Sequence, residues 1–210
     1  MNDFVFGIIG GIALLMYGVG KLGDGLEKAS GKIMKTILRV LTGKVWSAFL
    51  VGTVITALVQ SSTAITVLTV GFVNAGLMKL PQAVGIIYGA NIGTTITAQL
   101  MAFSFNFKLT DVALLILGAG FAINYFARKE MLKHIGDAIM GFGMMFLGLK
   151  ILNSGIPFMQ GSETLKYFFL NYASIPIIGI VLGATATALV QSSSATVGLV
   201  MVLGMAGLVD

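Results

Sequence analysis

The sequence has 210 residues, of which 57% are hydrophobic and 10% are charged, and its formal net charge is +5. Soluble domains carry about 25% charged residues, so a soluble fold of this size would have too little polar surface to cover itself. The 13 basic residues lie between apolar segments rather than along one amphipathic face, which argues against nucleic-acid binding and for membrane orientation. The absence of cysteine excludes disulfides, thiolate nucleophiles and Cys-ligated metals.

Eight apolar segments follow one another and predict an all-α membrane protein. They cover residues 4–22, 45–59, 64–77, 82–103, 112–127, 135–152, 175–190 and 195–209. Four of them are long enough, or nearly so, to cross a hydrocarbon core of about 30 Å at about 1.5 Å per residue. The other four form two consecutive pairs, whose arms of about 15 residues reach only about 22 Å. Each pair therefore predicts a re-entrant helical hairpin that enters and leaves the membrane by the same face.

Polar residues separate the two arms of each pair, and we expect them at hairpin tips near the bilayer midplane. They are Gln60, Ser61, Ser62 and Thr63 in the first pair, and Gln191, Ser192, Ser193 and Ser194 in the second. Polar groups at that depth must find partners in protein, ions or water. Residues 51–77 align with residues 182–208 at a constant shift of 131, with 13 identities in 27 positions that include the run TALVQSS.

The duplicated hairpins predict two repeats of inverted topology. The first repeat is residues 1–134 with its hairpin at 45–77, and the second is residues 135–210 with its hairpin at 175–209. Gly11, Gly18 and Gly25 match Gly141, Gly148 and Gly155 at a shift of 130. The first repeat crosses the membrane three times, which is an odd number. The second repeat therefore starts on the opposite side of the membrane and has the inverted orientation. Inverted repeats with broken helices are typical of secondary transporters.

The basic residues predict the orientation of the chain in a cell inner (plasma) membrane. The connection at residues 20–44 carries six basic residues and is expected in the cytoplasm, so the N-terminus is expected outside. The same scheme brings the basic cluster at residues 128–133 to the cytoplasmic side. If each short pair instead crossed the membrane as one kinked span, the number of crossings would change, and the two basic stretches would no longer lie on the same side.

The predicted tips could form a small polar binding site. A broken helix leaves free N–H groups that suit an anion and free C=O groups that suit a cation. A third polar run at residues 89–97 could unwind locally, and its Asn91, Thr94 and Thr95 could complete the wall. Because no ionisable side chain falls at either tip, a bound anion must rely on N–H groups, hydroxyls and co-bound cations. The alternative for each hydroxyl is a bond to its own helix or packing between helices.

The two Gln-Ser-Ser tips and the GANIGTT run at residues 89–95 resemble the type II sodium-dependent phosphate cotransporter family. The resemblance implies a non-enzymatic symporter that moves inorganic phosphate with sodium as the coupling ion, without another cofactor, in a lipid bilayer. It also implies the residues that bind phosphate and sodium, which are Gln60, Ser61, Ser62, Thr63, Asn91, Thr94, Thr95, Gln191, Ser192, Ser193 and Ser194.

Two features leave alternatives open. By the shift of 131, a second polar segment is expected near residues 220–226, whereas the sequence stops at Asp210, so we expect a chain truncated in its second repeat. A homodimer or a missing C-terminal half could complete it. The alternative functions are transport of another small oxyanion or solute, and a non-transporting membrane fragment or scaffold. An enzyme is not expected, because no nucleophile and base pair, metal cluster or nucleotide motif occurs.

Overall fold

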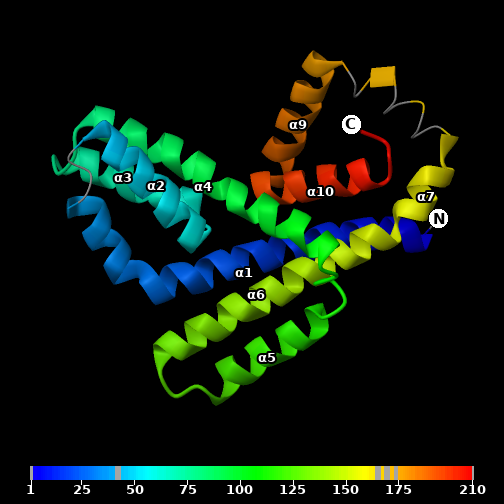
Figure 1. Ribbon diagram of the computed structural model, residues 1–210, viewed down its shortest axis with the longest axis horizontal. Coiled ribbons are helices and arrows are strands. Elements are labelled where there is room, and N and C mark those ends of the chain that lie inside the picture. The colour runs from blue at the N-terminus through cyan, green and yellow to red at the C-terminus, as the bar shows by residue number, and fades with distance from the viewer. Residues whose placement is uncertain (1, 41–43, 164–166, 168–170, 173–174, 210) are drawn as a thin grey trace.

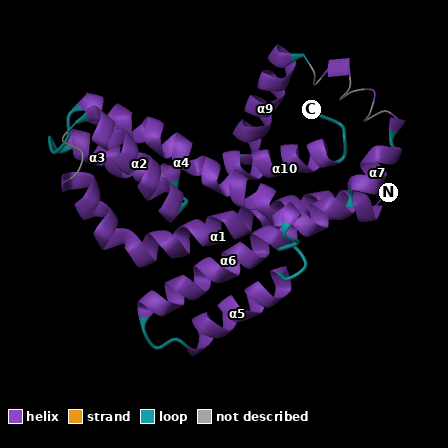
Figure 2. Cartoon of the chain, in the orientation of Figure 1, coloured by secondary structure: helices purple, strands orange, loops and turns teal. Residues whose placement is uncertain are grey.

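The computed structural model describes residues 2–40, 44–163, 167, 171–172 and 175–209. The described residues form helices and contain no β-strand (Figure 2), which confirms the all-α class. Among the described residues, two helical stretches are long and apolar enough to cross a membrane by length and composition, Phe6–Ser30 with 25 residues and Glu130–Phe158 with 29 residues.

The helices follow the predicted apolar segments closely. In chain order they are α1 (Asn2–Val40), α2 (Val45–Val59), α3 (Ser62–Asn74), α4 (Leu80–Asn106), α5 (Ala113–Phe126), α6 (Glu130–Ser154), α7 (Ile156–Gly161), α9 (Pro176–Val190) and α10 (Ser193–Met205). The short arms of both predicted pairs are therefore separate helices, α2 with α3 and α9 with α10.

Two local expectations were wrong. The basic stretch after residue 20 was expected as a connection, but α1 continues through it to Val40, because its Leu, Glu, Lys, Ala and Met residues favour helix. The polar run at residues 89–97 was expected to permit unwinding, but α4 is continuous from Leu80 to Asn106. Gly89 and Gly93 instead allow α4 to pack closely against α2.

α1 and α6 pack side by side along their length (Figure 1). A methyl group added at Gly11 would lie 2.8 Å from Leu152 Cγ, and one added at Gly25 would lie 2.5 Å from Ala138 N. Rising numbers on α1 meet falling numbers on α6, so the two helices are antiparallel. Glycines therefore let these backbones approach, as small residues do in membrane helix pairs.

α2 and α4 run parallel to each other. A methyl group at Gly85 would lie 2.8 Å from Val45 O, and one at Gly89 would lie 2.8 Å from Thr53 N, so numbers rise together along the two helices. The chain must therefore reverse direction in α3, between them. Figure 1 shows α3 beside α2 and α4 at the same end of the molecule.

The main core joins the two halves of the chain. Leu15 of α1, Met101 of α4, Phe146 and Leu149 of α6 and Val202 of α10 are buried together. In contrast, α9 contributes no buried residue and stands away from α1 and α6 in Figure 1. The packing of α10 against α1, α4 and α6 thus brings the second helix break towards the first.

Candidate functional site

The two helix breaks have the same backbone conformation. Gln60 ends α2 with φ 59° and ψ 20°, and Gln191 ends α9 with φ 56° and ψ 25°. Their backbone N–H groups donate to Thr56 O and Thr187 O, both at 2.7 Å. Left-handed conformations are uncommon for residues other than glycine. Both sequences therefore stop their first arm by the same local geometry.

A serine caps the next helix in each case. Ser61 Oγ accepts a hydrogen bond from Ala64 N at 3.3 Å, and Ser192 Oγ accepts one from Ala195 N at 3.3 Å. Each break is thus two residues long, and the polar residues after it occupy the first turns of α3 and α10. The remaining N–H groups of these turns have no partner inside their helices and favour an anion.

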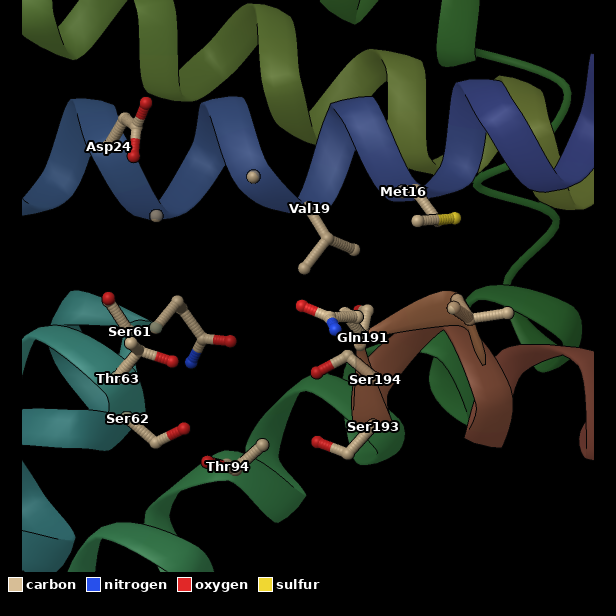
Figure 3. A pocket seen from close by; sticks show the side chains of 15 residues that line it. Met16, Val19, Asp24, Ser61, Ser62, Thr63, Thr94, Gln191, Ser193 and Ser194 are labelled. Carbon is tan, nitrogen blue, oxygen red and sulfur yellow. The ribbon is translucent and has the colours of Figure 1, made fainter. Parts of the chain in front are cut away.

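A cavity of about 290 Å³ lies between the two breaks (Figure 3). It includes nine of the predicted site residues, which are Gln60, Ser61, Ser62, Thr63, Thr94, Gln191, Ser192, Ser193 and Ser194. In Figure 3 the first tip faces the second across this space, with α1 on one side and Thr94 of α4 on the other. The structure thus brings together polar groups that are far apart in the sequence.

Asn91 and Thr95 have a different position. They lie on an exposed face of α4 and line a neighbouring pocket of about 170 Å³, which they share with Thr94, Ser193 and Ser194. Thr95 Oγ1 donates to Ile92 O at 2.7 Å, so its hydroxyl bonds to its own helix. These two predicted residues are adjacent to the main cavity and do not line it.

Asp24 was missed by the sequence reasoning. It lies on α1 at the rim of the cavity (Figure 3), and among the described residues that line the cavity it is the one with a charged side chain. It also lines a second pocket with Lys21, Lys28 and Asp137, where Lys21 Nζ pairs with Asp137 Oδ1 at 2.8 Å. The sequence signal for Asp24 is an acidic residue between two glycines, inside the stretch that is predicted to be a connection.

Gln60 is held by bonds to two helices. Its Oε1 accepts from the Thr97 hydroxyl of α4, and its Nε2 donates to Ala57 O of α2. Thr97 is only 2% exposed, so this bond is shielded from solvent. The carboxamide of the first tip therefore has a fixed orientation, and Thr97 is a second residue that the sequence analysis did not single out.

Comparisons with known proteins agree on one family. The family model described as Na+/Pi-cotransporter matches residues 14–154. The Bacillus subtilis "Uncharacterized protein YqeW" is 28% identical over 194 residues, which are 90% of this chain and 60% of that protein. The Escherichia coli "Putative inorganic phosphate export protein YjbB" is 27% identical over 203 residues, which are 97% of this chain and 37% of that protein.

A shorter match extends to a mammalian protein. The "Sodium-dependent phosphate transport protein 2A" of Rattus norvegicus is 33% identical over 98 residues, which are 45% of this chain and 15% of that protein. The chain thus spans 60% or less of the length of these curated relatives. No solved structure matches the chain.

Proposed function

Because the chain belongs to the Na+/Pi-cotransporter family, we propose that it is a membrane symporter that couples inorganic phosphate to sodium at the cavity between the two tips. The family indicates a transport protein of the membrane and favours phosphate as the substrate. The sodium coupling, the site residues and the re-entrant architecture are the further content of this proposal.

The observation that carries the proposal is the pair of capped helix starts at one cavity. α3 and α10 begin beside the same space, and Ser62, Thr63, Ser193 and Ser194 line it from their first turns. Phosphate oxygens accept hydrogen bonds, and these turns supply N–H and O–H donors. The cavity can therefore bind an oxyanion from two sides.

The charge of the cavity gives a reason for coupling to a cation. Asp24 is acidic, and no Lys, Arg or His occurs among the described residues that line the cavity. A bound phosphate and the Asp24 carboxylate would carry charge of the same sign, and like charges repel each other more strongly inside a protein than in water. A co-bound sodium ion would offset this repulsion, so phosphate is expected to bind well only when sodium is present.

The packing of α1 and α6 supports two inverted repeats, residues 1–134 and 135–210. A methyl group at Gly148 would lie 2.8 Å from Gly11 O, and one at Gly18 would lie 2.8 Å from Gly141 O. The shift of 130 between the repeats converts the first contact into the second. Such reciprocal contacts are the property of a two-fold axis, here passing between two antiparallel helices.

The parallel course of α2 and α4 supports a re-entrant first hairpin. If α2 and α3 formed one kinked span, α4 would run back against α2, whereas Gly85 meets Val45 and Gly89 meets Phe49 and Thr53 in the same direction. The proposed chain therefore enters and leaves on the cytoplasmic side before α4 crosses the membrane. The N-terminus is proposed to lie outside an inner (plasma) membrane.

The test is thermal unfolding of the detergent-purified chain with phosphate, in sodium and in potassium buffers. A ligand that binds only the folded state raises the melting temperature. We expect stabilisation with sodium and phosphate together and none with potassium and phosphate. Ser62→Ala combined with Ser193→Ala should abolish the phosphate effect, and an intact effect in this variant would disprove the site.

A second candidate function is the transport of another small oxyanion, because hydroxyl and N–H donors alone discriminate oxyanions poorly. Competition separates the two candidates. Sulfate at about tenfold excess should leave the phosphate effect in place if the site prefers phosphate, because such an excess offsets a preference of only about 1.4 kcal/mol. Loss of the phosphate effect under these conditions would favour the broader specificity.

A further inference from the structure

A buried polar cluster lies where the end of α2 packs against α4, behind the first tip. Thr56 and Gln60 are one helical turn apart on α2, and Gly93 and Thr97 are one turn apart on α4. A methyl group at Gly93 would lie 2.8 Å from Thr56 Cβ, and Thr97 Oγ1 donates to Gln60 Oε1. The exposed fractions of Thr56 and Thr97 are 0% and 2%.

The hydroxyl of Thr56 is the unusual member of this cluster. Its Oγ1 atom is buried and has no hydrogen-bond partner among the described residues. Buried hydroxyls nearly always have a partner, because an unpaired one loses its hydration without compensation. This oxygen therefore marks a position for a group that the described part of the chain does not supply.

The chemistry of the cluster suits a monovalent cation. Thr56, Gln60 and Thr97 offer neutral side-chain oxygens, and hard cations prefer oxygen ligands. The cluster is at the C-terminal end of α2, where the helix dipole favours positive charge. Broken-helix ends of this kind coordinate sodium in other transporter folds.

We propose that the coupling sodium ion binds in this cluster, with Thr56, Gln60 and Thr97 as its side-chain ligands. The inference rests on the proposed function and assigns its sodium ion to a place behind the cavity wall. Gln60 belongs both to the cluster and to the cavity, so sodium bound behind it fixes the tip that phosphate contacts. Because such coupling is reciprocal, phosphate must also raise the affinity for sodium.

The experiment is a sodium titration of the melting temperature of the full chain without phosphate, at constant ionic strength in choline. Thr56→Val removes a hydroxyl that bonds to no described residue, so the sodium-free melting temperature should stay the same or rise. The sodium concentration at half-maximal stabilisation should increase about tenfold or more, because the loss of a group that binds an ion, or that orients its ligands, lowers the affinity for the ion by about that factor. Thr97→Val should give a similar increase.

Two variants serve as matched controls. Thr69 is also fully buried, but its hydroxyl donates to Ile65 O at 2.7 Å, so Thr69→Val should leave the sodium midpoint unchanged. Thr187→Val changes the counterpart of Thr56 on α9, where it is partly exposed, and should also leave the midpoint unchanged. A change in either control equal to that of Thr56→Val would overturn the assignment.

The outcomes separate this inference from the proposed function. An unchanged sodium midpoint in both Thr56→Val and Thr97→Val would overturn the cluster as the sodium site. The same result is expected if the cluster binds only a water molecule, and that result also overturns the proposal. If phosphate then still stabilised these variants only with sodium, the proposed symport would survive with its ion elsewhere. If wild type responded to phosphate in choline as well as in sodium, both proposals would fail.

Discussion

Ser61 and Ser192 show how single side chains can stop one helix and start another. Each follows a glutamine in the left-handed conformation, and each accepts a hydrogen bond from a backbone N–H three residues ahead. The serine hydroxyl takes one N–H donor of the first turn, and the residues of that turn line the cavity. The polar tip thus has a structural cause in addition to its proposed chemistry.

This capping predicts a graded response at Ser61. Ser61→Ala should lower the free energy of unfolding by about 1 kcal/mol, because alanine is a poor N-cap, whereas Ser61→Gly should cost only a few tenths. Equilibrium unfolding of the purified chain in detergent measures both values. Equal losses for alanine and glycine would show that the serine acts through its side-chain bond to something other than the helix start.

At the level of residues, the repeated sequence predicts where the helices break, whereas contacts that only folding creates carry no such signal. The run TALVQSS occurs twice, so Gln60 and Gln191 could be predicted as tip residues, and both lie at the cavity. Asp24 and Thr97 carry no such signal, because their importance depends on how α1 and α4 pack around the tip. Asn91 lines the neighbouring pocket, because the continuous α4 turns it to another face than Thr94 has toward the main cavity.

At the scale of the helices, α2 and α9 are duplicates in sequence with different surroundings. Gly52 of α2 faces α4, where an added methyl group would lie 2.9 Å from Ile86 Cα. Its counterpart Gly183 of α9 has no atom within 4 Å of such a methyl group. The same substitution should therefore have opposite effects in the two helices.

Gly52→Ala should destabilise the chain by about 1–3 kcal/mol through overpacking. Gly183→Ala should stabilise it by about 0.4–1 kcal/mol, because alanine reduces the freedom of the unfolded chain at a helical position. Melting temperatures of the two variants beside wild type measure the difference. Destabilisation by Gly183→Ala would mean that α9 packs against another helix in the purified protein, for example in a second copy of the chain.

The helices themselves were predictable because apolar length and turn residues determine them locally. All eight predicted segments correspond to α1 to α6, α9 and α10, with ends that differ by a few residues except in α1. The C-terminal extension of α1 was missed because charged residues were read as a connection, although Lys and Glu favour helix. Charge marks the membrane boundary and does not mark the end of a helix.

At the scale of the whole molecule, the amount of exposed apolar surface is large. The chain exposes 12157 Å², whereas a compact soluble protein of its mass exposes about 9,300 Å². Large apolar residues such as Trp46, Leu115 and Leu189 are among the most exposed. A lipid bilayer covers such surface without cost, which agrees with the membrane location of the family.

The helix directions also predict which loops share a side of the membrane. α2 and α4 are parallel, so the residues before them, Lys44 and Lys79, should lie on one side of the membrane. If α4 crosses the membrane and α5 crosses back, Lys129 before α6 should lie on the same side as Lys44 and Lys79. The ion pair between Lys150 and Asp111, at 3.1 Å, brings the end of α6 to the α4–α5 loop on the opposite side. Most of the basic residues belong to the first side, which we propose is cytoplasmic.

Single cysteines test this arrangement directly, because the native sequence has none to interfere. In intact cells, a membrane-impermeant maleimide should label Thr110→Cys from outside and should not label Lys79→Cys or Lys129→Cys until the membrane is opened. Labelling of Thr110 and Lys79 from the same side would exclude a spanning α4, because these residues flank that helix. Labelling of Lys79→Cys from outside while Lys44→Cys is protected would mean that α2 and α3 cross the membrane together, and the two tips could then not meet at its midplane.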